Sequence, residues 1–232
     1  SGARFYYLKN EAVLLDMALQ RLAIELAGRK GVTLIEPPLM LRRQPYEGIT
    51  NLEVFEEMLY KIQDEDLYLI ATSEHSIAAY YMNEILEDKT LPARFLGISP
   101  CFRKEAGAHG KDTKGIFRVH HFTKVEQFVF CKPEDSIAEH ELLLKNAEEI
   151  YRKLKLPYRV VELCSGQVGS VSSKTYDIEC WMPAQQAFRE AVSCSNCTDF
   201  QARGLNIRYT GKNGNKAYLH TLNSTSIATS RI

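Results

Sequence analysis

The sequence of 232 residues has no uninterrupted apolar run near the roughly 18 to 20 residues that a membrane-spanning helix needs, and residues 1–10 do not resemble a secretory signal. Its 29 basic and 29 acidic residues cancel, so no overall field draws the chain to nucleic acid or to an anionic membrane. Internal repeats and low-complexity segments are also missing. These absences predict a cytoplasmic protein with no membrane partner, in which any contact with RNA depends on local patches.

Cysteine chemistry is also limited. The six cysteines are scattered, mostly within apolar, strand-like runs where buried free thiols are common. Cys194 and Cys197 form a single CxxC pair, and neither a second CxxC nor a pair of histidines supplies the two further ligands that a zinc site needs. The pattern favours buried structural cysteines, with a metal or redox role for the pair as the alternative.

With 45% apolar residues, a chain of this length can bury one sizeable core, which favours one domain. Helical spacing predicts three helices, over 10–30, from about 72 to 86 and over 133–154. Asn10 would cap the first helix, and Thr72 or Ser73 would cap the second. The acidic residues of the third helix are expected on a solvated face. Strand-like runs lie at 95–102, 122–130, 158–164, 175–182, 187–194 and 217–222. Residues 32–41 predict an edge strand that contains two prolines, and residues 46–61 fit either a loop or a short helix.

The two strands at 95–102 and 122–130 are joined by a glycine-rich loop that contains Gly107, Gly110 and Gly115. Alternation along a strand puts Phe122, Lys124 and Glu126 on one face. By the same rule, Arg103 and Glu105 share a face. Fixed arginines, an aromatic ring and carboxylates on one face suit a planar, multiply negative ligand such as a nucleotide. The alternative is a solvated hairpin face with cross-strand ion pairs. Three histidines, His109, His120 and His121, lie nearby, and His120 and His121 are interpreted as structural or solvated.

Glu190 is a second candidate site residue. It lies in a predicted strand among Phe188, Val192 and Cys194. A carboxylate on a mostly apolar strand face is costly unless a cation or metal pairs with it.

Several ordered segments resemble class II aminoacyl-tRNA synthetases, with the seryl-specific members nearest. Residues 100–107, 115–118 and 121–126 resemble motif 2, residues 31–40 resemble motif 1, and residues 220–231 resemble the start of motif 3, with Ser, Thr and Ala where the family usually has glycines. Residues 72–74 resemble the Thr-x-Glu loop of the seryl members, and the segments 174–179, 189–190, 193–197, 199–203 and 206–209 match them almost throughout.

This resemblance implies an α+β fold in which an antiparallel sheet is flanked by helices. Residues 1–232 would form one catalytic domain that lacks the N-terminal tRNA-binding coiled coil and the helix after motif 3. The implied activity is ATP-dependent activation of serine to seryl-adenylate with Mg²⁺, followed in the full-length homodimeric enzyme by transfer to tRNA(Ser). The alternatives are a synthetase-like ligase that charges a carrier protein, and a truncated, non-catalytic dimer module that binds nucleotide.

The resemblance also implies roles at matching positions. In the nucleotide site, Arg103 would bind the α-phosphate, and Glu105 and Phe122 would contact the adenine. Arg118 and Arg231 would bind the outer phosphates or cover the purine. Arg103 and Arg231 would be the catalytic residues. Glu190 and Ser193 would hold magnesium. Serine would contact Thr72, Glu74 and Glu126 through its ammonium, Arg103 through its carboxylate, and Asn223 and Thr225 through its hydroxyl. The structural alternatives are a core position for Phe122, an ion pair for Glu126, a turn for Asn223, and helix capping for Thr72 and Glu74.

Overall fold

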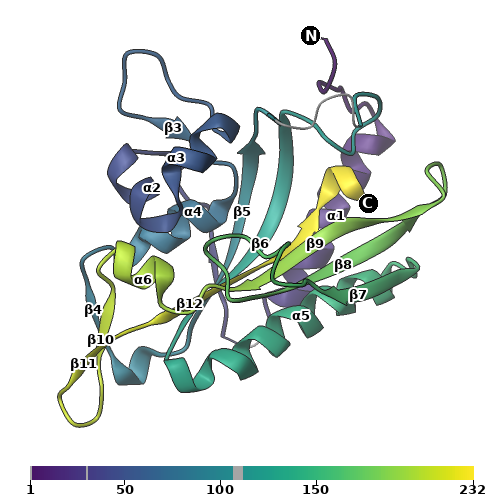
Figure 1. Cartoon of the computed structure of the whole chain (residues 1–232). Coiled ribbons are helices and arrows are strands. Elements are labelled where there is room, and N and C mark those ends of the chain that lie inside the picture. The colour runs from purple at the N-terminus through teal and green to yellow at the C-terminus, as the bar shows by residue number, and fades with distance from the viewer. Residues whose placement is uncertain (1, 30, 107–111) are drawn as a thin grey trace.

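The computed structural model describes residues 2–29, 31–106 and 112–232. Within them, the principal sheet has the strand order β1-β5-β6-β12-β9-β8-β7 (Figure 1). Neighbouring strands are antiparallel except β1 and β5, which are parallel. The strands are β1 (Thr33–Ile35), β5 (Ala93–Phe102), β6 (His121–Cys131), β12 (His220–Ala228), β9 (Ala187–Asn196), β8 (Lys174–Met182) and β7 (Tyr158–Glu162). The predicted α+β class with an antiparallel sheet is confirmed.

Two long helices cover one face of this sheet. They are α1 (Glu11–Ala27) and α5 (Ser136–Lys153), and they contact each other as well as β6 and β12. Their apolar stripes explain the arrangement: Leu19 and Ala23 of α1 join Leu143 and Ala147 of α5 in the largest buried cluster, together with Leu222 of β12. Burial of these stripes against the sheet is the main source of stability for this layer.

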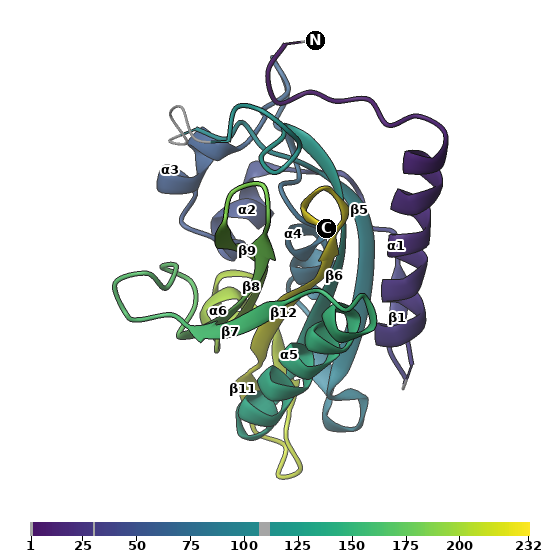
Figure 2. The same cartoon turned by 90° about the vertical axis from the view of Figure 1, so that its right-hand side faces the viewer.

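Shorter helices lie on the opposite face, as Figure 2 shows for the side of β5 and β6 away from α1. They are α2 (Arg43–Ile49), α3 (Leu52–Phe55), α4 (Ser73–Ala78) and α6 (Phe200–Gly204). Helix α4 comes very close to β5 at Gly97, where an added Cβ would lie 2.6 Å from Ile77 Cδ1 and 2.7 Å from Ser73 Oγ. A glycine at this point therefore lets α4 lie directly on the sheet.

Two small sheets and several 3₁₀ turns complete the described elements. Strands β2 (Met40–Leu41) and β3 (Tyr68–Leu69) pair with each other, and β4 (Ile85–Glu87), β10 (Arg208–Thr210) and β11 (Lys216–Tyr218) form a three-stranded sheet. The 3₁₀ turns are η1 (Glu56–Met58), η2 (Ala79–Tyr81), η3 (Asp88–Thr90), η4 (Pro133–Asp135) and η5 (Thr229–Arg231). None of the helices in the described ranges is both long and apolar enough to cross a membrane.

Most predicted elements are present, with several corrections. The 32–41 segment splits at its prolines into the edge strand β1 and the short β2, and the undecided 46–61 stretch contains α2, α3 and η1. The predicted helix from 72 to 86 is wrong beyond residue 81, because Ile85–Glu87 instead pairs with β10. Asn10 precedes α1 as predicted, but its side chain makes no capping hydrogen bond. Gly107, Gly110 and His109 lie outside the described residues.

The acids of α5 are not all on a solvated face. Glu139 is buried and accepts hydrogen bonds from Arg94 Nε at 2.7 Å and Nη2 at 2.5 Å. Its partner comes from β5, 45 residues earlier, so the periodicity of the helix alone does not reveal this ion pair. Such a bidentate pair satisfies a carboxylate that burial would otherwise destabilise.

Candidate active site

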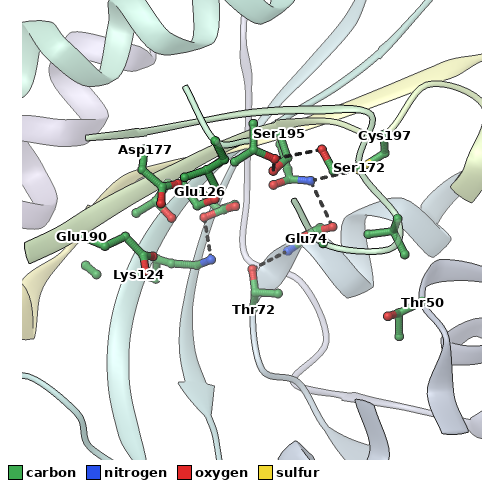
Figure 3. Close-up of a pocket in the computed structure, with 18 of the residues that line it drawn as sticks. Thr50, Thr72, Glu74, Lys124, Glu126, Ser172, Asp177, Glu190, Ser195 and Cys197 are labelled. Carbon is green, nitrogen blue, oxygen red and sulfur yellow. Dashed lines mark hydrogen bonds and ion pairs between the residues drawn. The ribbon is translucent and has the colours of Figure 1, made fainter. Parts of the chain in front are cut away.

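A cavity of about 720 Å³ opens on the face of the sheet opposite α1 and α5 (Figure 3). Its size is within the usual range for small-molecule and cofactor sites. Ten of the twelve predicted site residues line it: Thr72, Glu74, Arg103, Phe122, Glu126, Glu190, Ser193, Asn223, Thr225 and Arg231. The structure therefore brings together residues that are up to 159 positions apart in the sequence (231 − 72).

Arg103 and Phe122 form a cationic and aromatic part of the cavity wall. Arg103 follows β5, and its Nε donates a hydrogen bond to the carbonyl oxygen of Ala71 at 3.2 Å. Its guanidinium carbon lies 5.3 Å from the centre of the Phe122 ring. Phe122 is also part of a small buried cluster with Cys101 and Val119, so it packs in the core as well as lining the cavity.

Arg231 contributes a second cation. Its Nη1 donates to the backbone oxygen of Glu190 at 3.0 Å and lies 3.3 Å from the Oε1 atom of that residue. Its guanidinium also lies 4.9 Å from the centre of the Phe117 ring, over which Arg189 is placed at 4.3 Å. Burial lowers the pKa of Arg231, and the Glu190 carboxylate opposes that shift. Arg231 thus has two fixed contacts that orient it towards the cavity.

Glu105 and Arg118, in contrast, do not line the cavity. Arg118 donates to Glu105 Oε2 at 3.2 Å and to Asp112 Oδ2 at 3.1 Å, and Asp112 also accepts from Arg189. These hydrogen bonds, led by that of Arg189, lower the pKa of Asp112. The predicted contacts of Glu105 and Arg118 with a nucleotide are therefore not pre-formed in the cavity wall.

A β-bulge determines where Glu190 points. Ile178 pairs with Val192, but the next pair is Glu179 with Glu190, which leaves Ala191 as an extra residue in β9. The bulge turns Glu190 to the same side as Ser193, and its side chain is 48% exposed in the cavity. The expectation that Glu190 lies on an apolar face is wrong, because the strict alternation on which it rested breaks at Ala191.

The other part of the cavity is rich in carboxylates. Thr72 caps α4 by accepting a hydrogen bond from the Glu74 amide at 3.2 Å, so capping and cavity lining coexist there. Burial, reinforced by the charge of Glu126, raises the pKa of Glu74 to about 6. Glu126 lies 2.7 Å from Lys124 Nζ, a partner in its own strand rather than across the hairpin.

Asn223 and Thr225 lie within β12 rather than in a turn. Asn223 Nδ2 donates to Glu74 Oε1 at 3.1 Å, and Thr225 is directly opposite Glu126 in the register of β12 and β6. The cavity therefore has one part with arginines and an aromatic ring and another with carboxylates and small polar groups. Such an arrangement suits a ligand that carries phosphates and an aromatic base at one end and an ammonium group at the other.

Comparison with known proteins identifies the family. The model of the tRNA synthetase class II core domain (G, H, P, S and T) matches residues 58–232. The chain belongs to this family.

Individual relatives of this class II core domain are similar over its whole length. A serine–tRNA ligase of Methanoregula boonei is 60% identical, the alignment covering 100% of the chain and 55% of the relative. The crystal structure of seryl-tRNA synthetase from Pyrococcus horikoshii complexed with ATP superposes with a TM-score of 0.96 at 58% identity. The superposition covers 100% of this chain and 52% of the Pyrococcus horikoshii chain. For the crystal structure of the cytoplasmic serine–tRNA ligase of Naegleria fowleri in complex with AMP, the TM-score is 0.92 at 42% identity. This superposition covers 99% of this chain and 55% of the Naegleria fowleri chain. The chain thus spans about half the length of these relatives.

Two further carboxylates of this class II core belong to the candidate site, although neither was predicted as a site residue. Asp177 and Glu179 of β8 both line the cavity. Burial and the charge of Glu190 raise the pKa of Asp177 to about 6, and its Oδ1 atom is buried without a hydrogen bond from the described residues. Glu179 accepts from Arg159 at 2.7 Å. The alternation of acidic with apolar residues along 176–182 was the available signal, since it places both acids on one face.

The described residues contain no group of three His, Cys, Asp or Glu side chains placed to hold a metal ion. Magnesium does not require one, because it usually binds through one or two carboxylates together with substrate phosphates and water. Glu190 and Ser193 line the cavity side by side, and the buried Asp177 carboxylate is opposite Ser193 in the sheet. These hard oxygen donors fit a magnesium ion that is brought in with a nucleotide.

Proposed function

We propose that the chain is the catalytic core, as one domain over residues 1–232, of a serine–tRNA ligase. It activates serine with ATP to seryl-adenylate and pyrophosphate, and the full-length enzyme transfers the seryl group to tRNA(Ser). The main observation in support is the two-part cavity, with arginines at one end and carboxylates at the other. The names of the relatives, and the ATP and AMP complexes among them, support the same assignment.

At the nucleotide end, the serine carboxylate attacks the α-phosphate while charge builds on the phosphate oxygens. Catalysis of such a step depends mainly on positioning and electrostatics. Arg103 binds the α-phosphate and the serine carboxylate, and Phe122, which the Arg103 guanidinium already contacts, stacks on the adenine. Arg231 binds the outer phosphates or covers the purine. Glu105 and Arg118 reach the nucleotide only if their own ion pair rearranges.

Magnesium is part of this proposal. Glu190 and Ser193 would hold the ion, which supplies positive charge to the phosphates that leave as pyrophosphate. Glu190 is already 3.3 Å from Arg231, so the chain keeps an arginine and a carboxylate together at this end of the cavity.

At the other end, the serine ammonium is bound by Thr72, Glu74 and Glu126. Asn223 and Thr225 are next to those carboxylates and would hydrogen-bond the serine hydroxyl. A small pocket of this kind rejects alanine, because its buried polar groups would be left without a partner.

A homodimer and a cytoplasmic location complete the proposal. The N-terminal half of α1 exposes Val13, Leu14, Leu15 and Met17, and the neighbouring edge strand β1 exposes Leu34. Large apolar residues that are exposed together mark a protein–protein contact. Leu34 also lies within residues 31–40, the segment that resembles motif 1. Sedimentation velocity should give the mass of two chains, and a monomer at micromolar concentration would contradict this part. The cytoplasmic relative from Naegleria fowleri supports the location.

The deciding experiment is amino-acid-dependent ATP–pyrophosphate exchange without tRNA, comparing serine with alanine, glycine and threonine. Exchange with serine alone is expected. Exchange with glycine or alanine but not serine would instead favour a ligase that charges a carrier protein. Nucleotide binding with no exchange for any amino acid would favour a non-catalytic module.

A further inference from the structure

A buried glutamine lies directly behind the serine end of the cavity. Gln201 of α6 is fully buried and is absent from the cavity wall. Its Nε2 donates to Glu74 Oε1 at 2.9 Å, and its Oε1 accepts from the Thr221 hydroxyl at 2.7 Å. Thr221 is also fully buried, in the central strand β12. The two side chains therefore connect the Glu74 carboxylate to the middle of the sheet.

The orientation of the Gln201 amide follows from its partners. An ionised carboxylate only accepts hydrogen bonds, so the amide nitrogen has to face Glu74. The amide oxygen then faces Thr221, whose hydroxyl can donate to it. A flipped amide would place two acceptors against each other at Glu74. Thr221 thus fixes the direction in which Gln201 donates.

The arrangement leaves one oxygen of Glu74 for a ligand. Oε1 accepts from both Gln201 and Asn223, whereas Oε2 accepts no hydrogen bond within the part of the chain that the structure describes. The charged or titratable groups that influence Glu74, from all elements packed around it, are Glu126, Lys124, Arg103, Cys197 and Tyr46. Burial and Glu126 raise the Glu74 pKa, while Lys124, the Gln201 hydrogen bond and Arg103 lower it.

We propose that Gln201 is a positioning residue for amino-acid recognition: with Thr221 it holds Glu74 ionised and turned so that Oε2 meets the substrate ammonium. This inference rests on the proposed function, because it assigns Glu74 to the ammonium of serine. Gln201 itself does not touch the substrate. Its effect is on the affinity for serine and not on the chemical step or on ATP.

The test is Gln201→Met, which preserves length and removes both polar atoms. Loss of a hydrogen bond to a charged group should raise the KM for serine about ten- to hundredfold in the exchange assay. The KM for ATP should not change. Without the amide donor the pKa of Glu74 rises, so the loss of serine affinity should be larger at pH 6 than at pH 8.

Thr221→Val provides a second, nearly isosteric variant in case the first does not fold. It frees the Gln201 amide to rotate, so serine KM should rise in the same direction but only severalfold. Gln127→Met is the matched control: Gln127 is a buried glutamine of β6 that donates to the Leu143 carbonyl oxygen at 3.1 Å, away from the cavity. Its substitution should reduce stability without changing serine KM.

A purely structural role for Gln201 would lower the active fraction and so kcat, with serine KM and its pH dependence unchanged. Wild-type serine KM and pH profile in both Gln201→Met and Thr221→Val would overturn the inference while the proposed function stands. Absence of serine-dependent exchange in the wild-type chain would instead remove the proposed function on which it rests.

Discussion

The ion pair between Lys124 and Glu126 gives the sharpest test of the cavity's electrostatics. The two side chains are only 7% and 2% exposed, and Nζ lies 2.7 Å from Oε2. That oxygen makes no aligned hydrogen bond with the described residues. The positive charge of Lys124 is therefore what offsets the cost of burying the Glu126 carboxylate. Removing one partner of a buried pair costs about 3–5 kcal/mol, because the remaining charge stays buried and unpaired.

Lys124→Met should therefore lower the free energy of unfolding by about 3 kcal/mol, the lower end of that range because the cavity admits water beside the pair. For a chain of this size that corresponds to a fall in Tm of about 6–12 °C. Urea unfolding and scanning calorimetry at pH 7.5 would measure both quantities.

Two further variants make the reasoning refutable. Lys124→Met/Glu126→Gln should recover most of the lost stability, because the amide carries no charge. Lys132→Met removes a more exposed pair, Lys132 with Asp88 at 3.0 Å, and should cost less than about 1 kcal/mol. A loss below about 1 kcal/mol in Lys124→Met, or a double variant no more stable than the single one, would show that the pair does not compensate Glu126.

Three other outcomes are expected. Arg103→Ala should abolish serine-dependent ATP–pyrophosphate exchange with an unchanged circular dichroism spectrum; wild-type exchange in this variant would remove Arg103 from the site. Gly97→Ala should raise serine KM at least tenfold, since its Cβ would displace Ser73 and Ile77 of α4; exchange kinetics would measure this, and an unchanged KM would contradict the close packing there. Burial lowers the pKa of His75 to about 3 from an unfolded value near 6.5, so its contribution to stability is present above pH 6.5 and is lost as pH falls towards 3. The free energy of unfolding of the wild type relative to His75→Gln should fall by about 1.4 kcal/mol per pH unit below pH 6. Urea unfolding of both proteins at several pH values would measure this difference, and a difference that does not change with pH would refute the reasoning.

Local patterns in the sequence were sufficient for the main elements. The apolar stripes at 11–27 and 136–153 form the two long helices, and the runs around 95–102 and 122–130 form the central strands. Alternation along β6 correctly grouped Phe122, Lys124 and Glu126, and all three line the cavity. These inferences succeed because side-chain direction in a regular helix or strand depends on neighbours within a few residues.

Local patterns failed where distant segments decide the geometry. The helix after residue 72 ends early because β10, more than 120 residues later, pairs with 85–87. The face of Glu190 depends on the bulge at Ala191, which appears only in the pairing of β9 with β8. The ion pair between Arg118 and Glu105 is likewise a contact that no local pattern indicated.

The sequence by itself determined the two long helices, most strands of the principal sheet and the chemical types of side chain available for a site. Only the tertiary structure decided that Glu74 meets Gln201 and Asn223, 127 and 149 residues away, and that one of its oxygens stays open to the cavity. The physical reason is that a hydrogen bond acts over about 3 Å. Its existence therefore depends on the packing of α4, α6 and β12, and no periodicity within any one of these segments specifies it.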